Sequence, residues 1–136
     1  MRRIRMLAIA ATVVIALKAS PLPAHHSLGV YDQTKLVTIK GTVAQILWRN
    51  PHTWVVLNIS NTDGTMATQQ VEIAGPSRLL QTGFSQSSLN IGDSVTFEVW
   101  FPLDPRYSNG PAGRTVTLAD GRKFDVADNW LQSRPR

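Results

Sequence analysis

Three histidines are the residues of this chain best suited to chemistry. His25 and His26 follow Ala24 directly, and His52 ends the stretch "WRNPH". If an export signal is removed after Ala24, His25 becomes the first residue and offers its α-amine and its ring to one ion, with His26 beside it. Imidazole and amine ligands without thiolate favour Cu(II), then Ni(II) or Zn(II). One hypothesis is therefore a Cu(II) site formed by His25, His26 and His52.

The alternative hypothesis assigns no metal to these histidines. Histidines in an exposed tail are commonly solvated, and a histidine that follows proline can form a hydrogen bond within a turn between strands. The residue types alone leave both hypotheses open.

Aromatic and basic residues beside two connections suggest a second kind of site. Trp54 and Arg49 flank the Asn-Pro-His turn, whereas Tyr107 and Arg106 lie in the Pro/Gly-rich loop 102–113. The loops of small barrels often bind ligands, and aromatic rings can stack on them. The alternative assigns the arginines to solvated surface and the strand tryptophans to the core. These tryptophans are Trp48, Trp54 and Trp100.

The sequence contains no arrangement typical of a catalytic site. Glu72 and Glu98 could act as paired carboxylates only at a defined separation, and Ser27 beside His26 does not make a triad. The stretch "NGPAG" lacks the lysine of a phosphate-binding loop. We therefore predict a binding protein and assign no catalytic residue. An enzyme stays an alternative only if the terminal histidine binds copper and activates oxygen.

The first 24 residues have the layout of a secretory signal. Three arginines precede the apolar run "MLAIAATVVIAL", and Ala24 follows a short proline-containing segment. A retained signal anchor is the alternative, but the run is shorter than the about 20 apolar residues that span a bilayer. We expect cleavage after Ala24, although Ala19 is a second candidate, and a periplasmic or secreted protein without a stable membrane anchor.

Signal removal also changes the charge. It removes four of the 14 Lys and Arg residues and none of the 9 Asp and Glu residues, so the formal charge falls from +5 to +1. This balance gives no electrostatic support for nucleic-acid binding. We expect a periplasmic protein or a small ligand as partner. Because the chain has no cysteine, disulfides and thiolate metal sites are excluded.

Short β-branched runs separated by turns predict an all-β domain with one short helix. We expect an amino-terminal arm at 25–34 and a single domain at 35–136, with Gly41 at a bend of a long first strand. A helix from Pro76 to Thr82 should bury Leu79 or Leu80. This pattern predicts an OB-like Greek-key barrel of five or six strands, with a small β-sandwich as the alternative. The expected strands lie in 35–50, 53–60, 65–75, 90–101 and 114–126.

Several motifs resemble a family of small secreted bacterial proteins of unknown function. They are "AHHS", "IKGTVAQILWRNPHTWVVL", "GPSRLLQTGFSQSSLNIGDSV" and "RTVTLADGRKF", and together they span nearly all of the chain after the signal. The resemblance implies export and a small β domain, and it supplies no catalytic residues.

Overall fold

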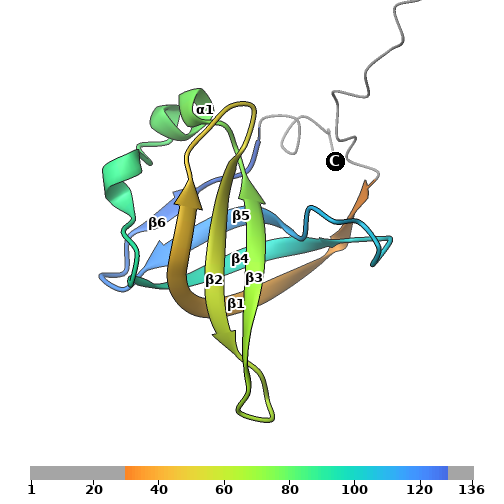
Figure 1. Cartoon of the computed structure of the whole chain (residues 1–136). Helices are drawn as coiled ribbons and strands as arrows, with labels where there is room; N and C mark the ends of the chain where they lie inside the picture. Colours follow the sequence, from red (N-terminus) through yellow and green to blue (C-terminus); the bar gives the residue numbers. More distant parts are fainter. Residues whose placement is uncertain (1–29, 129–136) are drawn as a thin grey trace, which may run out of the picture.

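The computed structural model describes residues 30–128, which form a ring of six strands with one short α-helix (Figure 1). The Asp-Gly pairs at 63–64 and 120–121 form turns between strands, and both glycines have positive φ. The elements are β1 (Tyr31–Leu47), β2 (Thr53–Ser60), β3 (Met66–Ile73), α1 (Pro76–Gln81), the 3-10 helix η2 (Gln86–Ser88), β4 (Ser94–Pro102), β5 (Ala112–Leu118) and β6 (Lys123–Asp125).

The strand pairing follows the order of a partly open Greek-key barrel. Neighbouring strands run in the order β3-β2-β1-β4-β5-β6 and pair antiparallel, and a parallel bridge between Glu72 and Ala112 joins β3 to β5. The short helix lies between β3 and β4, as in OB-like barrels. The expected all-β architecture with one short helix is therefore confirmed, although the ring closes through this single bridge.

The long first strand serves both halves of the ring. It starts at Tyr31 rather than at the expected Lys35, and at Thr42 it pairs with β4 on one side and β2 on the other. Gly41 precedes this change of partner, and a Cβ there would lie 2.6 Å from the backbone oxygen of Asn58. The absence of a side chain thus permits β1 to approach β2 closely at its bend.

The helix covers one end of the ring (Figure 1). Leu79 is fully buried in the main core and Leu80 is 59% exposed, so the prediction that one of these leucines is buried is confirmed. No helix among the described residues is long and apolar enough to cross a membrane. The main core contains Val43, Val55, Leu57, Val71, Ile73, Leu79, Phe84, Phe97, Val99, Val116 and Val126.

The strand tryptophans lie in three different environments. Trp100 is buried in a second, smaller apolar cluster with Tyr31, Ala112 and Ala127. Trp48 is half-buried and packs against the main core. Trp54 lies on the opposite face of β2 from the core residue Val55, because side chains alternate along a strand. The prediction that these tryptophans belong to the core is therefore correct for Trp100 and partly correct for Trp48. Trp54 is half-exposed on the outer face of β2.

Candidate functional site

The ring of His52 lies between two carboxylates contributed by distant parts of the chain. Its Nδ1 is 2.6 Å from Oε1 of Glu72, and its Nε2 is 3.3 Å from Oδ2 of Asp128. The side chains of His52 and Glu72 are only 12% and 6% exposed, whereas that of Asp128 is 25% exposed. A nearly buried imidazole is thus held on both sides by acidic groups.

The β2–β3 ladder brings His52 and Glu72 together. Thr53 pairs with Ile73, and the backbone N–H of Thr53 donates to the carbonyl of Ala74, so the residue before β2 lies beside the end of β3. The turn that precedes His52 packs on Gly75, where a Cβ would overlap the carbonyl oxygen of Pro51. The "NPH" motif therefore has a structural role, because it places the His52 ring at this edge of the sheet.

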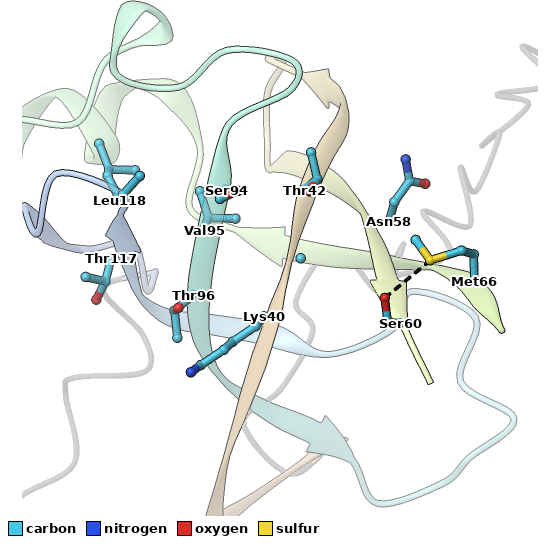
Figure 2. Close-up of a pocket in the computed structure, with 12 residues that line it drawn as sticks. Lys40, Thr42, Asn58, Ser60, Met66, Ser94, Val95, Thr96, Thr117 and Leu118 are labelled. Atoms are coloured by element: carbon cyan, nitrogen blue, oxygen red, sulfur yellow. Dashed lines mark hydrogen bonds between the residues drawn. The ribbon is translucent and has the colours of Figure 1, made fainter. Parts of the chain in front are cut away.

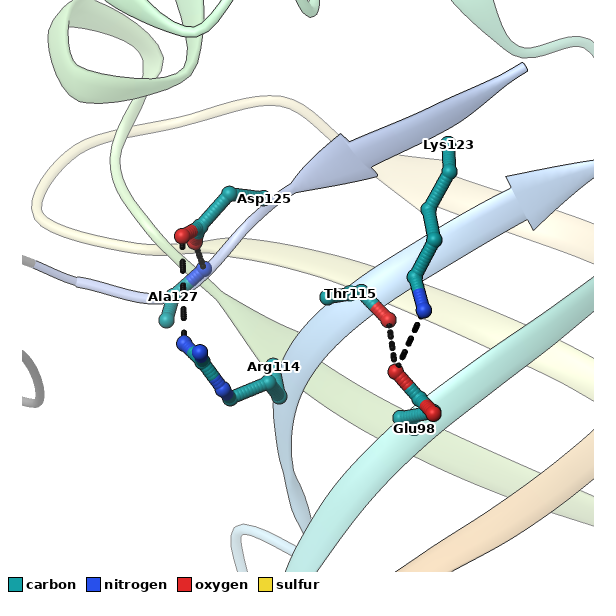
Figure 3. Close-up of polar contacts among 6 residues, drawn as sticks. All are labelled: Glu98, Arg114, Thr115, Lys123, Asp125 and Ala127. Carbon is teal, nitrogen blue, oxygen red and sulfur yellow. Dashed lines mark hydrogen bonds and ion pairs between the residues drawn. The ribbon is translucent and has the colours of Figure 1, made fainter.

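A set of polar contacts after β6 positions Asp128. The backbone N–H of Ala127 donates to Oδ1 of Asp125 at 3.1 Å, and Asp125 also lies 3.8 Å from a guanidinium nitrogen of Arg114 (Figure 3). The N–H of Ala74 donates to the carbonyl of Val126, which fixes the same segment against the end of β3. These bonds hold the residues between β6 and Asp128 against the ring.

Tyr31 completes the cluster from the first strand. Its hydroxyl donates to Oε2 of Glu72 at 3.2 Å, and its ring packs in the second apolar cluster. Tyr107, from the β4–β5 loop, meets the Tyr31 ring edge-on, with the centroids 5.9 Å apart. Burial raises the pKa of the Tyr31 hydroxyl, and the charge of Glu72 raises it further, so Tyr31 is a hydrogen-bond donor at neutral pH.

The two carboxylates favour the charged form of the histidine. The hydrogen bond from His52 to Glu72 raises the pKa of the ring above its usual value, and the charge of Asp128 acts in the same direction against the opposing effect of burial. In the protonated ring both nitrogens carry hydrogens, and each can donate to one carboxylate.

A small hollow lies within the cluster. Its volume is about 10 Å³, and its walls include Tyr31, His52, Glu72 and Asp128. A space of this size corresponds to about one water molecule or one ion. Gly113 forms part of the wall, and a Cβ at that position would lie 2.7 Å from Cγ2 of Ile73, so a larger residue would disturb the packing here.

The structure gathers some of the residues selected from the sequence and leaves others apart. His52 is in the cluster, and Trp54 is the direct cross-strand partner of Glu72. Tyr107 reaches the cluster through Tyr31. His25 and His26 lie outside the described residues, so their contribution stays a prediction.

The two arginines do not join the cluster. The side chain of Arg106 is 88% exposed and binds Asp104, two residues before it. Arg49 is exposed in the β1–β2 connection. Both arginines therefore belong to the exposed surface of the described part of the chain.

Sequence reasoning missed two members of the cluster. Tyr31 fell in the segment expected to be an arm, and Asp128 follows the last strand without any motif around it. The sequence suggests Glu72 only as a partner of Glu98, but Glu98 accepts hydrogen bonds from Thr115 and Lys123 on the outer surface (Figure 3). Alternation along β3 places Glu72 on the face opposite the core residues Val71 and Ile73, so no local pattern marked this carboxylate as buried.

No group of three His, Cys, Asp or Glu side chains within residues 30–128 is arranged to hold a metal ion by itself. The reason is visible in the cluster, because the two carboxylates contact opposite edges of the His52 ring. Within this part of the chain, a metal would therefore need further ligands.

The fold and the cluster define a small β-barrel domain with a nearly buried imidazole between carboxylates at one end of its β2–β3 face. The chain belongs to a family of unknown function, DUF6152, whose model matches residues 12–106. The matched region contains the three histidines and Glu72 and ends before Asp128. A comparison with curated proteins found no match.

Proposed function

We propose that this protein is an exported binding protein that holds one Cu(II) ion between His52 and the amino-terminal histidines His25 and His26. The observation that carries the proposal is the pairing of Nδ1 of His52 with Glu72 at 2.6 Å. Metal-binding histidines almost always donate their second ring N–H to a carboxylate or carbonyl, which orients the ring and increases its basicity. Glu72 would be this positioning carboxylate, and Nε2 of His52 would be the ligand atom.

The surroundings of Nε2 support the same assignment. Nε2 faces Asp128, whose contact is longer at 3.3 Å and whose side chain is more exposed than that of Glu72. The hollow in the cluster would accept one atom-sized occupant. A metal ion would take the place of the proton on Nε2, and the Asp128 carboxylate would supply an oxygen ligand beside it.

The chain length also allows the amino-terminal histidines to reach the cluster. Tyr31, which contacts Glu72, is five positions after His26. Five residues span at most about 18 Å when extended. His25 would add its α-amine if cleavage after Ala24 makes it the first residue, and nitrogen ligands from two segments would complete a site of mixed nitrogen and oxygen atoms.

A second candidate function is a metal-free periplasmic binding module for a protein or small ligand. Trp54 supports it, because this residue lies half-buried on the outer face of β2 beside Glu72, where loops of OB-like barrels commonly bind ligands. In this proposal the loop 102–113 contributes Tyr107, and the charged His52 only ties the β1–β2 turn to the carboxyl-terminal segment.

Copper titration of the exported protein separates the two functions. Intact mass first establishes whether His25 is the first residue, and Cu(II) is then added against a competing chelator. The matched proteins are the mature chain, a chain with one extra amino-terminal alanine, His52→Ala and Glu72→Gln. We expect the extra amino-terminal alanine and His52→Ala each to weaken Cu(II) binding. Glu72→Gln should weaken it about 10- to 100-fold, because Glu72 would orient the His52 ring.

Circular dichroism of each variant controls for folding. Equal Cu(II) affinity of all four proteins would reject the site. A loss confined to the extended chain would keep His25 as a ligand and remove His52 from the proposal.

A further inference from the structure

A polar groove lies across β1 on the outer surface of the ring, at the opposite end of β2 from the His52 cluster. Its volume is about 620 Å³, within the usual range of about 300 to 1,000 Å³ for small-molecule sites. Figure 2 shows its lining side chains on both sides of β1, with Asn58, Ser60 and Met66 on one side and Ser94, Thr96 and Thr117 on the other.

The groove is lined mainly by hydroxyl and amide side chains that the strand register fixes in rows. Lys40 pairs with Thr96, and Thr96 pairs with Thr117, so these three side chains share the outer face. Thr42 pairs with both Ser94 and Asn58 on that same face. Backbone ladders therefore preorganise the polar groups without any need for a ligand.

These polar groups are available for binding. Within residues 30–128, no side-chain hydrogen bond or ion pair involves the polar atoms of the six residues that form the two rows. Ser60, at the edge, donates only to the sulfur of Met66. The six residues are Lys40, Thr42, Asn58, Ser94, Thr96 and Thr117.

The charge of the groove selects the ligand class. Lys40 is the sole charged side chain among the described residues that line it. Lys123, the next residue in the row after Thr117, is already bound to Glu98 at 2.9 Å. A ligand with several hydroxyl groups would match the row of donors and acceptors, and an acidic group on it would match Lys40.

Apolar parts of the groove fit the same kind of ligand. Met66 is 65% exposed at one side, whereas Val95 and Leu118 at the other side are only 5% and 8% exposed, so Met66 supplies most of the apolar surface. Sugar rings combine hydroxyl edges with apolar C–H faces, and a mixed lining accommodates both. We propose that this groove binds an acidic oligosaccharide, with Lys40 at its carboxylate and the threonine and serine hydroxyls at its sugar hydroxyls.

The test uses the mature full-length chain, kept in a chelator so that the histidine site stays without metal. Trigalacturonate and the neutral maltotriose are titrated while backbone amide chemical shifts are recorded. Trigalacturonate should shift the amides of residues 40–42, 94–96 and 117–118 and leave that of His52 unchanged. Lys40→Gln should weaken its binding about tenfold, or about 1.4 kcal/mol, because it removes the one positive charge among the described residues that line the groove.

Lys35→Gln is the matched control, because Lys35 is exposed on the same strand but faces away from the groove row. It should bind trigalacturonate as the unmodified chain does, and Thr96→Val should weaken binding without loss of the fold. The proposal is overturned if trigalacturonate causes no saturable shifts in the groove, if maltotriose binds equally well, or if Lys40→Gln and Lys35→Gln have the same effect.

Discussion

His52 and Glu72 form a nearly buried pair with Nδ1 2.6 Å from Oε1, at the point where β2 begins and β3 ends. Tyr31 and Asp128 contact opposite sides of this pair. The cluster therefore joins four segments of the ring. The free energy of unfolding should depend on the charges of His52 and of its two carboxylate partners.

Replacement of Glu72 by glutamine should destabilise the metal-free protein. The change keeps the shape but removes the negative charge that faces His52, and loss of a hydrogen bond to a buried charged group costs about 1.5 to 3 kcal/mol. Urea unfolding at pH 6 with a chelator present measures this cost.

Glu98→Gln is the control for that experiment. Glu98 binds Lys123 on the surface, where such pairs contribute at most about 1 kcal/mol. If Glu98→Gln destabilised the protein as much as Glu72→Gln, the buried pair would have no special role.

Protonation of His52 should make stability depend on pH in a specific direction. Its pKa is raised in the folded protein, mainly by the hydrogen bond to Glu72, so the folded state binds the proton more tightly than the unfolded state. The resulting stability is fully present below the unfolded pKa of about 6.5 and is lost as pH rises through the folded pKa. The free energy of unfolding of the chain minus that of His52→Gln should therefore decrease as pH rises.

Urea unfolding at a series of pH values, with a chelator present, gives this difference directly. A difference that stays constant or grows with pH would show that His52 is not stabilised as a cation. Titration of the ring carbon proton by NMR provides the independent measurement of the folded pKa.

The two leucines of α1 provide a matched pair. Leu79 is fully buried and Leu80 is 59% exposed on the same short helix. Leu79→Ala should cost about 2 to 5 kcal/mol because it leaves a cavity in the core, whereas Leu80→Ala should stay within about 0.5 kcal/mol of the unmodified chain. Thermal and urea unfolding test both, and equal losses would contradict the core position of Leu79.

Local patterns were sufficient to predict most of the fold. Asp-Gly pairs supply positive φ at Gly64 and Gly121, and alternation in "SVTFEVW" puts Val95, Phe97 and Val99 on one face of a strand, which the structure shows to be the core face. These patterns depend only on residues close together in the sequence, so they can be recognised without the tertiary structure.

The candidate site was harder to predict because its contacts are distant in sequence. His52 was a candidate by its residue type alone. Closure of the ring brings Tyr31 to Glu72 and Asp128 to His52, from the two ends of the described residues. No local pattern marks an aspartate that follows a last strand. The groove was missed for a related reason, since the row Lys40, Thr96 and Thr117 exists only in the register of three strands.

Gly41→Ala tests the close approach at the bend of β1. A Gly-to-Ala change in a strand ordinarily stabilises, because it reduces the freedom of the unfolded chain. Here the new Cβ would lie 2.6 Å from the backbone oxygen of Asn58 and 3.0 Å from Cγ2 of Ile59, so β1 and β2 must separate. Overpacking of this kind costs about 1 to 3 kcal/mol, and we expect a lower urea midpoint.

Thr42→Ala, at the exposed neighbouring position, is the control and should change stability by no more than about 0.5 kcal/mol. An increase in the midpoint for Gly41→Ala would mean that β1 can bend there with a side chain in place, and that the glycine is not what permits the strand to serve both halves of the ring.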